Sequence, residues 1–65
     1  MFIIREIMMG YGFDLATADT FEAAKTKVQA MGVAFIEDDA DYPGCADAYL
    51  NDCRCVAIQP VGFTL

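Results

Sequence analysis

One amphipathic helical segment, residues 19–32, constrains the fold of this chain more than any other feature. Asp19 with Glu22 three residues later is a variant of the capping box that begins helices, and Gly32 supplies the left-handed residue that commonly ends them. Apolar residues recur here at spacings of three and four, the pattern of one buried stripe: Phe21, Ala24, Val28 and Met31. A single helix of about three turns can cover only one face of a sheet.

The rest of the chain predicts strands. Gly10-Tyr11-Gly12 indicates a break, followed by a loop that runs to Asp19. Four segments have the apolar character of strands, the last two forming a hairpin: residues 2–9, 33–37, 45–50 and 53–59. We expect one α+β domain over residues 1–65, with two layers and the order β-α-β-β-β. The helix should pack on a four-stranded mixed sheet whose first two strands are parallel, because such crossovers are right-handed.

The second face of this sheet is expected to be apolar. A two-residue turn at Asn51-Asp52 would pair Leu50 with Cys53 and direct alternate residues of the hairpin away from the helix. Apolar residues make up 57% of the chain, more than the roughly 45–50% of typical domains. We therefore expect a homo-oligomer, in its simplest form a symmetric dimer. The predicted interface residues are Tyr49, Arg54, Val56, Ile58 and Phe63.

Charge limits the classes of partner. The formal net charge is −6, with ten acidic residues against four basic ones. Such a chain repels phosphate backbones, so we expect no direct nucleic-acid binding, and a basic protein is the partner class that the charge allows.

No apolar run is long enough to span a membrane, and Arg5 and Glu6 interrupt the pattern of a signal peptide. With three cysteines, an odd number, a disulfide framework is not indicated. We expect a cytoplasmic protein with reduced thiols.

The residue types that are missing disfavour catalysis. The sequence contains no His and no Ser, which removes the commonest general base and the usual nucleophile–base arrangements. Gly10-Tyr11-Gly12 lacks the further glycine or Lys-Ser/Thr pair of a phosphate-binding loop. The prediction leans away from an enzyme, and no cofactor is expected.

Three cysteines could be interpreted chemically. Cys53 and Cys55 lie two residues apart, with Cys45 nearby, but a closed zinc site normally takes four Cys or His ligands. The two-residue turn would place Cys45 on the face opposite Cys53 and Cys55. Buried cysteines that act as small hydrophobes are the favoured interpretation. The alternatives are a metal site shared across a dimer interface and a redox pair.

The acidic loop at residues 38–41 partly matches a calcium-binding loop. Asp39, Asp41 and Asp47 would occupy positions one, three and nine, so they are the candidate metal ligands. Pro43 at position five and Leu50 at position twelve do not fit that frame. A solvated loop is favoured, with calcium or magnesium binding as the alternative.

Asp47 and Arg54 are predicted to form an ion pair diagonally across the hairpin, where it would fix register or an interface. The alternative is that Asp47 is a functional carboxylate in a pocket beside Tyr49 or Tyr42.

Two functional hypotheses follow from these features. The first is a small acidic oligomeric interaction module that acts through its surface, with a regulatory or an inhibitory role as its specific forms. The second is an oligomer that binds a small molecule or metal between subunits.

Overall fold

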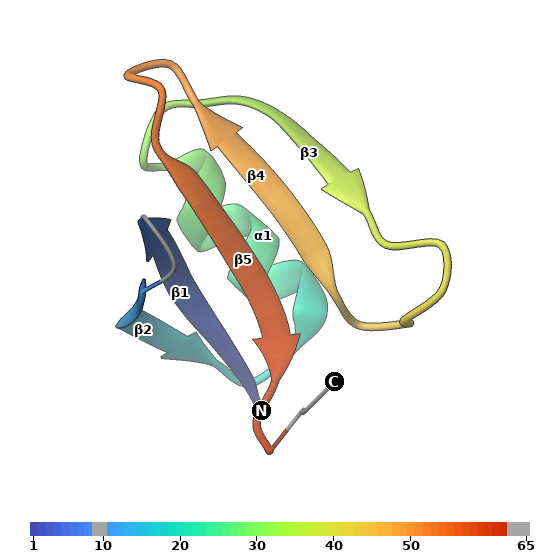
Figure 1. The fold of residues 1–65 in the computed structure, drawn as a ribbon. Coiled ribbons are helices and arrows are strands. Elements are labelled where there is room, and N and C mark those ends of the chain that lie inside the picture. The colour runs from blue at the N-terminus through green and yellow to red at the C-terminus, as the bar shows by residue number, and fades with distance from the viewer. Residues whose placement is uncertain (9–10, 63–65) are drawn as a thin grey trace.

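The computed structural model describes residues 1–8 and 11–62 and shows an α+β fold of one helix on a five-stranded sheet. The elements in chain order are β1 (Phe2–Met8), β2 (Tyr11–Ala18), α1 (Phe21–Gln29), β3 (Val33–Asp38), β4 (Ala46–Leu50) and β5 (Cys55–Pro60). The strands lie in the order β2-β1-β5-β4-β3, and every neighbouring pair is antiparallel (Figure 1). The α+β class is confirmed, whereas the four-stranded mixed sheet is wrong.

Strand β2 accounts for that difference. Residues 11–18, expected as a turn and loop, form an eight-residue strand that pairs with β1. Gly12 does not end the strand: a Cβ there would lie 2.6 Å from Arg5 Cδ, so the absent side chain leaves room for Arg5. Because β2 brings the chain back beside β1, the helix does not cross between parallel strands. The segment after the helix, β3, instead forms the far edge of the sheet.

The predicted helix is confirmed, with a different N-cap. Thr20, not Asp19, caps α1: its Oγ1 accepts a hydrogen bond from the Ala23 backbone N–H at 3.1 Å. Gly32 has the expected positive φ of +84° after the helix. Ala24 and Val28 of the predicted stripe are fully buried.

The turn between β4 and β5 sets which side chains face the helix. Three residues, 51–53, connect the strands, because the Leu50 N–H donates to the Arg54 carbonyl at 2.8 Å and Tyr49 pairs with Cys55. Cys53 takes a φ of +70°, in the position that closes such three-residue loops. The predicted two-residue turn is wrong, and the faces assigned to β5 are therefore exchanged.

The core lies between α1 and one face of the sheet, with α1 behind the sheet in Figure 1. Val56 and Ile58 are fully buried in this core, so their predicted place on the uncovered face is wrong. The buried cluster comprises Ile4, Ala18, Ala24, Val28, Ala46, Ala48, Leu50, Val56 and Ile58. Within the residues described, no helix has the length and apolar character needed to cross a membrane.

Candidate binding surfaces

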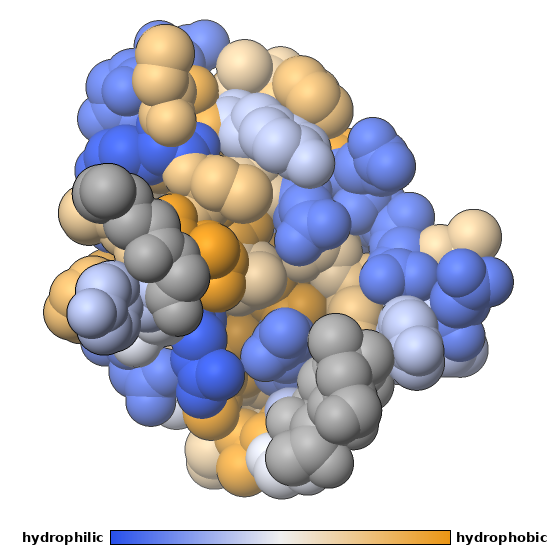
Figure 2. All heavy atoms as spheres, viewed as in Figure 1, coloured by the Kyte–Doolittle hydropathy of each residue, from blue (hydrophilic) through white to orange (hydrophobic). Residues whose placement is uncertain are grey.

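The sheet face opposite α1, here called the open face, is not covered by the helix, although the loop between β3 and β4 folds over one part of it, where Ala57 is buried. Its side chains alternate with those of the core along each strand. They come from β1 (Ile3, Arg5, Ile7), β5 (Cys55, Ala57, Gln59), β4 (Asp47, Tyr49) and β3 (Phe35, Glu37). Figure 2 views this face and shows apolar side chains exposed in its middle, with hydrophilic ones around them.

An aromatic pair stands at one side of the open face. Phe35 and Tyr49 are cross-strand neighbours, and their rings stack with centroids 4.6 Å apart at an interplanar angle of 23°. Phe35 is 53% exposed and Tyr49 38%. The predicted place of Tyr49 on the uncovered face is confirmed, and Phe35 is a surface residue that the sequence analysis missed. Exposed aromatics of this kind are enriched at the centres of protein interfaces.

Two carboxylates flank this aromatic pair. Glu37 of β3 lies directly opposite Asp47 of β4, and neither side chain forms an ion pair within the described residues. Asp47 is also the main cause of a raised pKa at Tyr49, followed by burial of the phenol. Like charges opposite each other in a sheet are unfavourable. This part of the open face therefore favours a positively charged group.

Arg54 does not pair with Asp47 as predicted. Its guanidinium instead makes a two-pronged contact with Glu6 of β1, with Nη2–Oε1 at 3.0 Å and Nε–Oε2 at 3.2 Å. Hydrogen bonding to Glu6 is the largest cause of a raised pKa at Arg54. The odd-length turn moved Arg54 to the face that carries α1. Arg54 thus ties β1 to the β4–β5 turn.

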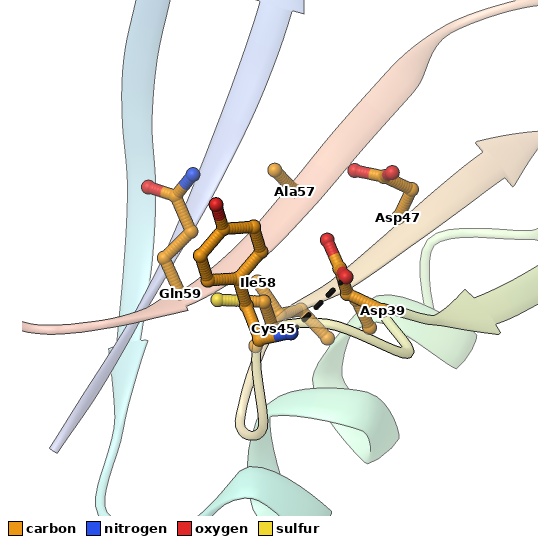
Figure 3. A pocket seen from close by; sticks show the side chains of 8 residues that line it. Asp39, Cys45, Asp47, Ala57, Ile58 and Gln59 are labelled. Atoms are coloured by element: carbon orange, nitrogen blue, oxygen red, sulfur yellow. Dashed lines mark hydrogen bonds between the residues drawn. The ribbon is translucent and has the colours of Figure 1, made fainter. Parts of the chain in front are cut away.

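A pocket of about 190 Å³ opens where the loop between β3 and β4 folds against the sheet (Figure 3). Figure 3 shows Asp39 and Asp47 at one side of this pocket and Gln59 at the other. Its full lining is Asp39, Tyr42, Cys45, Ala46, Asp47, Ala57, Ile58 and Gln59. The volume is below the roughly 300–1,000 Å³ of drug-sized ligand sites, so the pocket suits only a compact group.

The structure brings together two of the three candidate metal ligands. Asp39 and Asp47 line the pocket, whereas Asp41 does not. Asp39 Oδ1 already accepts the backbone N–H groups of Asp41 at 2.8 Å and Tyr42 at 3.2 Å, so it shapes the loop. Among residues 1–8 and 11–62, no three His, Cys, Asp or Glu side chains are grouped as a metal site requires.

The three cysteines are free thiols in different surroundings. Cys45 is buried beside the pocket, and Cys55 lies half-buried on the open face, so the odd-length turn places these two on the same side of the sheet. Burial, followed by nearby aspartates, raises the pKa of both thiols. Cys53 is exposed in the turn. A raised pKa keeps a thiol protonated and makes it a poor nucleophile at neutral pH.

A second apolar surface, here called the hairpin surface, lies on the β1–β2 hairpin. It comprises Met8, Tyr11, Phe13 and Leu15, which are 49%, 71%, 52% and 41% exposed. Sequence reasoning missed this surface, although Phe13 and Leu15 alternate with Asp14 in the period of a strand. Phe63 of the predicted interface lies outside the described residues.

Comparison of the chain with protein-family models, with curated proteins and with solved structures finds no match.

Proposed function

We propose that this chain is a small, self-associating binding module that receives a basic segment of another protein on the open face of its sheet. The observation that carries the proposal is the stacked Phe35–Tyr49 pair with Glu37 and Asp47 beside it, two carboxylates that form no ion pair in the part of the chain that the structure describes. Aromatic rings offer apolar contact and a favourable site for Lys or Arg, and the carboxylates add charge attraction.

Self-association is supported by how much apolar surface the single chain leaves exposed. The open face and the hairpin surface together expose seven large apolar side chains to 38% or more: Ile7, Met8, Tyr11, Phe13, Leu15, Phe35 and Tyr49. Surfaces of this kind on a small protein mark interaction sites. The two surfaces lie on different sides of the sheet, so one can serve self-association and the other a partner.

The pocket supports a second candidate function, the binding of a compact cationic small molecule. Asp39 and Asp47 supply negative charge, and Gln59 supplies a hydrogen-bonding amide. Native mass spectrometry of the purified protein, with and without a chelator, tests this candidate. Extra mass that persists with the chelator favours a small molecule, and extra mass lost with it favours a metal ion.

Titration of ¹⁵N-labelled protein with a short Lys- and Arg-rich peptide that includes one Leu tests the main proposal. We expect chemical-shift changes at Phe35, Glu37, Asp47 and Tyr49, weakening as salt is raised. A peptide with Glu in place of each basic residue serves as the control and should cause no such changes.

A matched pair of variants separates specific binding from general charge attraction. Phe35→Ala should weaken peptide binding, whereas Phe13→Ala, which removes an equally exposed ring from the hairpin surface, should leave it unchanged. Shift changes spread over all acidic residues, or an equal loss in both variants, would contradict a site on the open face.

A further inference from the structure

Strand β2 lies at an edge of the sheet, and among residues 1–8 and 11–62 no other strand pairs with its outer side. The Val61 N–H donates a hydrogen bond to the Met1 carbonyl, so the backbone of Met1 bonds toward β5. Backbone hydrogen bonds alternate in direction along a strand, so the other odd-numbered residues of β1 also bond toward β5: Ile3, Arg5 and Ile7. The even-numbered residues of β1 then bond toward β2, where Glu6 pairs with Phe13 and Met8 with Tyr11.

Gly12 and Asp14, which lie between those pairs, therefore direct their N–H and C=O groups outward. Lys27 closes one end of this edge, because its Nζ donates to the Thr17 carbonyl at 2.6 Å. The segment left open is residues 11–15.

We propose that two copies of this chain associate by antiparallel pairing of their β2 edges, with Phe13 of each copy on the two-fold axis. This inference rests on the self-association put forward above and names its surface. In this register Gly12 of one copy lies opposite Asp14 of the other, so the outward-facing backbone groups of both residues are paired. Tyr11 lies opposite the second copy's Leu15, the residue at which the pairing of β2 with β1 shifts by one and which has no partner in β1. The result is one continuous ten-stranded sheet.

Apolar side chains meet along this seam. Phe13 would pack on its symmetry mate, and each Tyr11 on a Leu15. All three are more than two-fifths exposed in the single chain, and cross-strand pairs of such residues stabilise sheets. An isologous contact of this kind closes after two copies, which limits growth into fibres.

The charges are also self-complementary. Asp14 is paired in its own chain with Arg5 at 2.9 Å, and the Arg5 side chain lies over the space left by Gly12. Because Gly12 faces the second copy's Asp14, each Arg5 gains a second carboxylate across the seam. Pairing of β2 edges thus adds opposite-charge contacts on the side away from the apolar seam.

The other surfaces oppose self-pairing. The edge strand β3 ends in Glu37 and Asp38, and the open face carries Glu37 and Asp47, which form no ion pair with any cation of residues 1–8 and 11–62. Of these carboxylates, Asp38 is the one that pairs with Lys25 within the described residues. Two copies meeting through either surface would bring like charges together in a chain whose net charge is already −6. Charge therefore selects the β2 edge for a second copy.

Phe13→Glu and Phe35→Glu form a matched test, because the two rings are 52% and 53% exposed. Phe13→Glu places two like charges on the two-fold axis and should weaken dimerisation more than about tenfold in sedimentation analysis. Phe35→Glu should leave the dissociation constant of the dimer unchanged. Circular dichroism of both variants checks that the fold is retained.

A cross-linking experiment tests the register directly. In a background of Cys53→Ala and Cys55→Ala, Phe13→Cys should form a disulfide-linked dimer on mild oxidation, because residues opposite each other in this geometry lie within disulfide reach. Phe35→Cys in the same background should not.

A dimer that resists Phe13→Glu, or that is lost only with Phe35→Glu, would overturn the β2 inference while leaving self-association intact. A wild-type chain that is monomeric throughout would overturn both. Peptide binding to the open face is independent of either result.

Discussion

At the scale of single residues, the backbone conformation of Cys53 decides which side chains of the whole strand β5 face the core. Its φ of +70° completes a three-residue turn, and this odd length moves Val56 and Ile58 into the core and Cys55 out of it. The sequence Asn51-Asp52 is equally compatible with a two-residue turn, and no glycine marks the left-handed position. The register of this hairpin therefore could not be predicted from local sequence.

Cys53→Gly should raise the free energy of unfolding by up to about 1 kcal/mol, because glycine adopts a positive φ without the steric cost of a Cβ. Urea denaturation monitored by circular dichroism measures the change. Cys53→Ala keeps the Cβ and should give no comparable gain. A destabilised Cys53→Gly protein would argue against this turn.

The three thiols should differ in their reaction with iodoacetamide. Cys53 is exposed and should be alkylated first, whereas Cys45 and Cys55 are shielded and have raised pKa values. Because the thiolate is the reactive form, alkylation of Cys45 and Cys55 should accelerate only at a pH above the ordinary thiol pKa. Peptide mapping by mass spectrometry identifies each site. Equal rates at Cys45 and Cys53 near neutral pH would contradict the structure.

At the scale of elements, the helix was predictable and strand β2 was not recognised. The helix combines a stripe at spacings of three and four with a capping signal and a terminal glycine, so several local signals agree. In β2, two glycines near its start suggested a turn and outweighed the alternation of Phe13, Asp14 and Leu15. Because β2 was not recognised, a parallel crossover was expected where the structure has an antiparallel hairpin, and the exposed hairpin surface was not predicted.

Thr20→Ala should lower the free energy of unfolding by about 1 kcal/mol, because it removes the acceptor for the Ala23 N–H. Asp19→Ala is the matched control and should cost only a few tenths of a kcal/mol, through lost charge near the helix N-terminus. Urea denaturation of both variants compares them. The reverse order would mean that Asp19 is the cap after all.

At the scale of the whole molecule, one helix covers one face of a five-stranded sheet, and the remaining apolar surface is divided between two places. The sequence composition predicted such a surplus correctly. The location of this surplus depended on the hairpin register and on β2. Of the predicted interface residues that the structure describes, Tyr49 alone lies on the uncovered face. The charges then separate the two surfaces. Glu37 and Asp47 on the open face form no ion pair among the described residues, whereas Asp14 at the β2 edge is neutralised by Arg5.

Ile58→Ala should lower the free energy of unfolding by about 2–5 kcal/mol, because Ile58 is fully buried between sheet and helix. Tyr49→Ala should cost about 1 kcal/mol, mainly the lost stacking with Phe35. The two-residue turn would place Ile58 on the open face and make its replacement mild. Denaturation of the two variants side by side distinguishes the two registers.

Sedimentation velocity of the wild-type chain, from low micromolar to the highest soluble concentration, tests the central claim of self-association most directly. We predict a reversible monomer–dimer equilibrium that shifts to the dimer as concentration rises and stops there, since the β2 contact closes on itself. A single monomeric species over the whole range would contradict self-association.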